Sequence, residues 1–160
     1  MDAEIRFTLN GKSVIFIGNP LRRLVDVLRE DFGMLGVKEG CGEGECGACS
    51  VIKDGKLVTS CIIPVGSVDG SEIMTIEGLR EKEEGKCLID AFADGGAVQC
   101  GFCIPGMVLA SYVLLRSNPH PTEDEIRLAI SGNICRCTGY DLIVESIMLA
   151  AKRGEELWAK

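Results

Sequence analysis

The stretch Gly40 to Cys49, GCGEGECGAC, constrains the fold most strongly because it gathers three cysteines and four glycines into ten residues. Cys41, Cys46 and Cys49 follow the spacing C-x4-C-x2-C, and Cys61 supplies a fourth thiol further along the chain. Glycines tolerate positive φ, so such a loop can wrap tightly and point its N–H groups at converging sulfurs. This is the spacing of plant-type 2Fe-2S ferredoxins. We therefore predict that these four cysteines hold one 2Fe-2S cluster.

A second set of four cysteines lies in the other half of the chain. Cys100 and Cys103 are spaced C-x2-C, and Cys135 and Cys137 are spaced C-x-C. We expect each pair in a tight loop at the start of a helix, where free N–H groups and positive potential stabilise thiolates. A lone C-x2-C also occurs in zinc knuckles and redox motifs. Two sets in one chain, one with plant-type spacing, favour a second 2Fe-2S cluster.

Composition and charge exclude several classes of function. The 160 residues include 24 acidic and 17 basic side chains, for a net charge of -7, which argues against a nucleic-acid partner. The longest apolar run, around residues 104–115, is interrupted by proline and glycine and is too short to cross a bilayer, so we expect no membrane insertion. No secretory signal is recognisable at the N-terminus. Nine cysteines in a cytoplasmic, reducing setting favour metal or redox chemistry over disulfides.

The first half of the chain has the pattern of a small mixed β domain. Polar and apolar residues alternate over residues 5–9 and again after Asn10-Gly11, which predicts a hairpin. Leucines and valine at positions 21, 24, 25 and 28 predict an amphipathic helix. Asp54-Gly55 predicts a second hairpin, and residues 73–76 supply a closing strand. We expect residues 1–76 to form a β-grasp, ferredoxin-like domain.

The second half has helical periodicity. The charged segment 77–85 predicts a connector, and residues 86–160 predict a four-helix bundle that holds the second cluster. Thr122 and Glu125 form a capping box before one of these helices. The fold class is thus α+β, a ferredoxin-like domain followed by a helical bundle. Cys87 is expected to be a buried apolar residue, and Trp158 either an anchor for another subunit or part of a frayed end.

Three segments then give a resemblance to a known family: GVKEGCGEGECGAC at 36–49, QCGFCIPGM at 99–107 and GNICRCTGY at 132–140. Together they resemble the iron–sulfur subunit of the molybdenum hydroxylases, the xanthine oxidase family. That family includes xanthine dehydrogenases, aldehyde oxidoreductases, nicotinate dehydrogenases and carbon monoxide dehydrogenases. The resemblance covers essentially the whole chain, with the motifs in the family's order.

The resemblance implies a role in electron transfer within an oxidoreductase complex. It implies a large molybdopterin-binding subunit and a medium FAD-binding subunit as partners. Electrons would leave the molybdenum centre one at a time, reach the cluster of the second cysteine set first, and pass through the plant-type cluster to FAD. Gln99, through its amide, and Cys137, through its sulfur, would contact the pterin. No catalytic residue is expected in this chain, and the expected substrate is a purine such as xanthine.

Two other classes of protein remain open on sequence grounds. A diffusible two-cluster ferredoxin would carry the same cysteines but meet its partners only transiently. A structural zinc protein would use the two sets as four-thiolate sites. Co-purification with larger subunits would distinguish a subunit of a stable complex from a diffusible ferredoxin. Visible colour would distinguish an iron–sulfur protein from a zinc protein, because zinc–thiolate sites are colourless.

Overall fold

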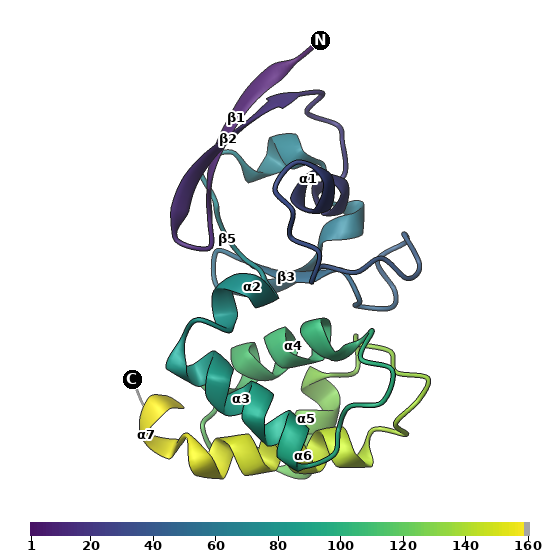
Figure 1. Cartoon of the computed structure of the whole chain (residues 1–160), viewed down its shortest axis with the longest axis vertical. Helices are drawn as coiled ribbons and strands as arrows, with labels where there is room; N and C mark the ends of the chain where they lie inside the picture. Colours follow the sequence, from purple (N-terminus) through teal and green to yellow (C-terminus); the bar gives the residue numbers. More distant parts are fainter. Residues whose placement is uncertain (159–160) are drawn as a thin grey trace.

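The computed structural model describes residues 1–158 and has two halves, a β-sheet half and a helical half, which pack against each other (Figure 1). The sheet half has five strands with the order β2-β1-β5-β3-β4. All neighbours in this sheet run antiparallel except β1 and β5, which run parallel. The strands are β1 (Ala3–Leu9), β2 (Lys12–Gly18), β3 (Ser50–Lys53), β4 (Lys56–Thr59) and β5 (Glu72–Met74).

Both predicted hairpins are confirmed, and their turns have the geometry that the sequence indicates. Asn10-Gly11 and Asp54-Gly55 all have positive φ, between 48° and 79°, as in the two-residue turns that match strand twist. The predicted closing strand does not lie at a sheet edge. β5 lies in the middle of the sheet, between β1 and β3, so it joins the two hairpins into one surface.

Helix α1 (Leu24–Glu30) covers this sheet and begins later than its sequence pattern predicts. The pattern places Leu21 on the apolar stripe, but Leu21 lies before the helix with 77% of its surface exposed. The reason is local: the Asn19 side chain accepts a hydrogen bond from the Leu21 N–H, and Arg23 is extended. The remaining stripe residues of α1 are fully buried in the core of the sheet half.

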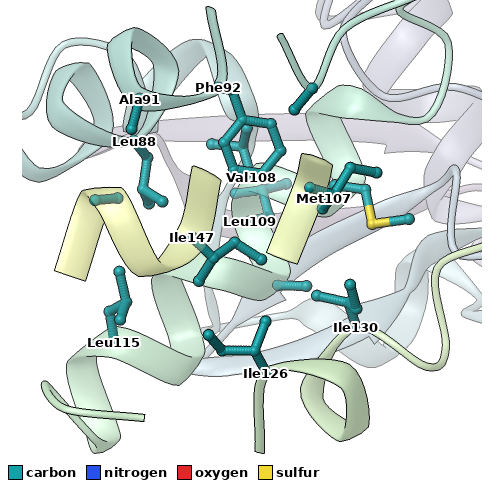
Figure 2. Close-up of a cluster of buried hydrophobic side chains, with 14 of the residues drawn as sticks. Leu88, Ala91, Phe92, Met107, Val108, Leu109, Leu115, Ile126, Ile130 and Ile147 are labelled. Carbon is teal, nitrogen blue, oxygen red and sulfur yellow. The ribbon is translucent and has the colours of Figure 1, made fainter. Parts of the chain in front are cut away.

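The helical half is a bundle with short helices at both ends. Its elements are α2 (Ile76–Leu79), α3 (Glu83–Asp94), α4 (Ile104–Ser117), α5 (Glu123–Ala129), α6 (Asp141–Arg153) and α7 (Glu155–Trp158). The segment 77–85, expected as a connector, contains most of α2 and the first turn of α3. The capping box is confirmed: the Thr122 side chain accepts from the Glu125 N–H, and the Glu125 side chain accepts from the Thr122 N–H. Apolar residues of α3, α4, α5 and α6 meet in one core (Figure 2).

Trp158 is part of this core and not an anchor for another subunit. Its side chain is 1% exposed, its indole N–H donates to the Ala150 carbonyl over 3.1 Å, and its ring meets Tyr112 edge to face. A Cβ on Gly154 would lie 2.6 Å from the indole nitrogen, so the glycine admits the ring. Cys87 also packs beside Gly154. It is partly buried, whereas the sequence predicts a buried residue.

The two halves meet along one face of α4, which contacts β3 and β4. In Figure 1, α4 lies directly beneath β3. Ile52 of β3 belongs to the core of the helical half. Within residues 1–158, no helix is both long and apolar enough to cross a bilayer.

Candidate iron–sulfur sites

The first candidate site is the loop of residues 40–49, which α1 and α2 hold in place. The Arg29 guanidinium on α1 donates to the Val37 carbonyl over 2.6 Å, and the Glu77 carboxylate on α2 accepts from the Gly36 N–H over 2.7 Å. The entry to the loop is therefore fixed on both sides. Cys41 and Cys46 are partly exposed, whereas the other two thiols of the first set are buried.

Backbone N–H groups of this loop point at sulfurs of the first cysteine set, as the glycines predict. The N–H groups of Glu43 and Glu45 each lie 3.4 Å from the Cys41 Sγ, and the Gly44 N–H lies 3.2 Å from the Cys61 Sγ. The N–H groups of Glu43, Cys46 and Glu45 lower the pKa of Cys41 to about 6. A thiolate is thus the preferred state of Cys41 at neutral pH.

Glycines are required here for conformation and for space. Gly42, Gly44 and Gly47 have positive φ, between 69° and 82°, where other residues are strained. A Cβ on Gly40 would lie 2.9 Å from the Cys46 Sγ. The loop therefore leaves no room for larger residues beside its sulfurs.

The second candidate site combines the loop before α4 with the loop before α6. Cys103 is the N-cap of α4, and its thiol interacts with Cys135 and Cys100. Cys137 interacts with Cys100, which raises the pKa of Cys137. The four cysteines of the second set are therefore together, with Cys100 and Cys137 exposed and Cys135 buried.

Thr138 and Tyr140, which follow Cys135 in the same loop, form hydrogen bonds with its sulfur and its backbone. The Thr138 hydroxyl donates to the Cys135 Sγ over 3.1 Å, and the Cys135 N–H donates to the Tyr140 hydroxyl oxygen over 2.8 Å. Burial raises the pKa of Cys135, but the Thr138 hydroxyl and the N–H groups of Thr138 and Cys137 outweigh it, so the net shift is downward. Tyr140 has φ of 74°, a strained value for an aromatic residue, and its hydroxyl reaches back to the backbone of Cys135.

The donor chemistry of both sets fits a 2Fe-2S cluster. Burial raises the pKa of Cys61 to about 11 and that of Cys103 to about 12, so these thiols need a cation to become thiolates, and a bound metal supplies that charge. Four cysteine thiols at each site are the donor set that a 2Fe-2S cluster takes.

The two sites are joined by direct contacts between their loops. The Ile134 N–H donates to the Cys46 carbonyl oxygen over 2.9 Å. The Asn133 side-chain amide donates to the Gly47 carbonyl over 3.0 Å and to the Ser50 hydroxyl over 3.3 Å. The loop of the second set is thus hydrogen-bonded to the loop of the first.

Sequence reasoning missed Asn133, Thr138 and Tyr140 as individual residues. All three lie in the segment GNICRCTGY beside the cysteines of the second set, but no local pattern tells that Asn133 reaches a loop 86 residues away. Gln99 is exposed beside Cys100. Its predicted pterin contact, like that of Cys137, remains a prediction.

Fold and sites together define an iron–sulfur electron-transfer protein with two separate binding domains. Residues 7–72 match the family model described as a 2Fe-2S iron-sulfur cluster binding domain, and residues 75–148 match that of a [2Fe-2S] binding domain. The chain is 50% identical over 149 residues to the nicotinate dehydrogenase small FeS subunit of Eubacterium barkeri, covering 93% of this chain and 95% of that protein. It is 44% identical over 147 residues to the xanthine dehydrogenase iron-sulfur-binding subunit of Escherichia coli, covering 90% and 91% respectively.

Solved structures agree with these sequence relatives. Quinoline 2-oxidoreductase from Pseudomonas putida 86 superposes with a TM-score of 0.91 at 39% identity, covering 97% of both chains. Aldehyde oxidoreductase from Desulfovibrio gigas superposes with a TM-score of 0.90 at 39% identity, covering 97% of this chain and 17% of that larger one. The chain belongs to the iron–sulfur subunit family of the molybdenum hydroxylases, as its motifs predict.

Proposed function

We propose that this chain relays electrons, one at a time, between a molybdopterin-binding subunit and an FAD-binding subunit of a hydroxylase complex. The observation that carries the proposal is the direct link between the two cysteine loops, in which the Ile134 N–H binds the Cys46 carbonyl. Ile134 precedes Cys135 in the chain. One hydrogen bond and a short run of covalent bonds therefore connect a cysteine of each set.

We assign the eight cysteines outside position 87 as cluster ligands. The first cluster would be held by Cys41, Cys46, Cys49 and Cys61, and the second by Cys100, Cys103, Cys135 and Cys137. When bound, each cluster supplies reversible one-electron transfer. The protein supplies the N–H groups, the Thr138 hydroxyl and the burial that decide how readily each cluster accepts an electron.

The surface around the second set supports its assignment as the entry point for electrons. Cys100 and Cys137 are exposed, and the neighbouring apolar side chains of Val98 and Phe102 are both 46% exposed. An apolar rim around a redox centre suits a stable subunit interface. It favours a subunit of a complex over a diffusible ferredoxin. Gln99 would lie in this interface and reach the pterin with its amide, beside the sulfur of Cys137.

We propose an N-heteroaromatic substrate for the complex. Two relatives support this class by their names, the nicotinate dehydrogenase subunit at 50% identity and the xanthine dehydrogenase subunit at 44%. Nicotinate and a purine such as xanthine are therefore the substrates to test first. The substrate would bind to the partner subunit, and this chain would contribute no acid, base or nucleophile. A cytoplasmic location remains a prediction.

The test is to purify the tagged chain from its native source under anaerobic conditions. We expect two larger subunits to co-purify, one with molybdenum and one with FAD, and we expect nicotinate or xanthine to bleach the visible absorption of the complex. A chain that emerges alone with both clusters would support the diffusible ferredoxin instead. Bleaching by an aldehyde but by neither heterocycle would contradict the substrate class and leave the relay intact.

A further inference from the structure

The junction between the two cysteine loops is built around one buried side chain, Asn133. It is 3% exposed, although it lies in a loop and carries a polar amide. Buried amides need partners, and here both partners belong to the other half of the molecule. The amide nitrogen donates to the Gly47 carbonyl and to the Ser50 hydroxyl. Ser50 in turn donates its hydroxyl to the same Gly47 carbonyl over 2.7 Å.

Gly47 lies between two cysteines of the first set, Cys46 and Cys49. Its φ is 69°, and a Cβ at this position would collide with the Gly132 carbonyl and lie 2.6 Å from the Asn133 amide nitrogen. The loop of the first set and the loop of the second set are therefore in backbone contact, with no side chain between them.

Helix α4 closes the junction from a third side. A Cβ on Gly106 would lie 2.5 Å from the Gly47 carbonyl oxygen and 2.9 Å from the Asn133 amide nitrogen. Gly106 follows Cys103 by less than one helical turn. Three of the segments that carry or adjoin cluster cysteines, the 40–49 loop, the start of α4 and the loop before α6, thus converge on the Asn133 amide.

We propose that Asn133 is a positioning residue that holds the two clusters in a fixed relation and thereby sets the electronic coupling between them. This inference rests on the proposed function, because it requires both clusters to be present. The rate of electron transfer between two centres falls steeply with their separation. Loss of the Asn133 amide would leave the Gly47 carbonyl with Ser50 alone and loosen the approach of the loops.

The test compares Asn133→Asp with the wild type in the complete chain. Aspartate keeps the size of asparagine but is an acceptor when ionised and opposes the Gly47 carbonyl. We measure iron per chain, the magnetic interaction between the two reduced clusters by EPR, and the rate at which an electron injected by a radiolytic pulse equilibrates between them. Asn19→Asp is the matched control because Asn19 is exposed and accepts from the Leu21 N–H, a role that aspartate can keep.

We expect Asn133→Asp to keep about four irons per chain, to lose most of the magnetic interaction and to equilibrate at least tenfold more slowly than the control. Unchanged coupling and an unchanged rate, even with lower thermal stability, would show that Asn133 is only structural and overturn the proposal. Fewer than four irons in the wild type itself would instead count against the proposed function.

A second variant decides the matter if Asn133→Asp loses iron. Ser50→Ala removes one of the two acceptors of the Asn133 amide and leaves the glycine contacts in place. We expect it to keep both clusters and to weaken the coupling in the same direction, by a smaller factor. Coupling identical to the wild type in Ser50→Ala would then overturn the proposal.

Discussion

The N–H of Ile134 donates a 2.9 Å hydrogen bond to the carbonyl oxygen of Cys46. These residues lie in different halves of the chain, and each half holds one set of four cysteines. The bond ties the two cysteine loops together, and with the contacts of α4 against β3 and β4 it makes the two halves one packed unit. The packing, the cluster environment and the ligands of this unit can each be tested by substitution.

Gly106→Ala is expected to destabilise the protein although alanine is the better helix former by about 1 kcal/mol. Gly106 lies in α4, and the new methyl would press on the Gly47 carbonyl at 2.5 Å. Overpacking of this kind costs roughly 1–3 kcal/mol, which urea unfolding of the anaerobic protein measures. Gly132→Ala is the control, because nothing lies within 4 Å of its Cβ position. A Gly106→Ala variant as stable as the wild type would contradict the close contact.

Thr138→Val is expected to lower the midpoint potential of the second cluster and leave that of the first unchanged. The variant keeps the shape of threonine but removes the hydroxyl that donates to the Cys135 Sγ, and hydrogen bonds to ligand sulfurs favour the more negative, reduced cluster. A decrease of roughly 60 mV corresponds to a tenfold change in a one-electron equilibrium. Redox titration followed by EPR measures both potentials, with Thr8→Val on β1 as control. Equal shifts at both clusters would argue against a local effect of the hydroxyl.

Trp158→Ala is expected to cost about 3–5 kcal/mol of unfolding free energy, the usual range for a buried aromatic residue. The indole is 1% exposed, packs on Tyr112 and donates to the Ala150 carbonyl. Thermal unfolding measures the loss. Leu128→Ala, at a position that is 75% exposed, should change stability by less than about 0.5 kcal/mol. A Trp158→Ala variant that is as stable as wild type but fails to bind partner subunits would contradict the core role and support the interface role, one of the two alternatives that the sequence left open.

Replacement of one cysteine in each set should remove one cluster and spare the other. Cys41→Ser and Cys137→Ser are each expected to lose one EPR signal, a different one in each case, because their side chains lie in separate sites. Cys87→Ser is the control, since Cys87 packs beside Trp158 and Gly154 and outside both sets. Loss of iron in Cys87→Ser would mean that the ligand assignment is wrong.

Much of this architecture follows from local sequence. Asn10-Gly11 and Asp54-Gly55 predict hairpins because two-residue turns with positive φ demand such residues. The glycines between Cys41 and Cys49 likewise predict a tight loop around the sulfurs, because glycine tolerates the positive φ that such a loop needs. Thr122 and Glu125 predict a helix start because each satisfies the backbone of the other.

The features that sequence reasoning missed depend on contacts that no periodic pattern encodes. Leu21 fits a helical stripe, yet the Asn19 side chain gives its N–H a partner before the helix starts. Trp158 lies in a charged tail, and only the folded chain shows that Gly154 admits its ring. Nothing in the local sequence distinguishes Asn133 from other loop residues, because its hydrogen-bond acceptor, the Gly47 carbonyl, is distant in the sequence. Hydrogen bonds between the two halves form only in the tertiary structure, so local sequence patterns do not predict them.

The proposed relay depends on two 2Fe-2S clusters in this chain. The most direct measurement is iron and acid-labile sulfide per chain in anaerobically purified protein, together with EPR after reduction by dithionite. We expect about four irons and about four sulfides, with two distinct signals. Zinc in place of iron, or about two irons with a single signal, would contradict the second site and with it the relay.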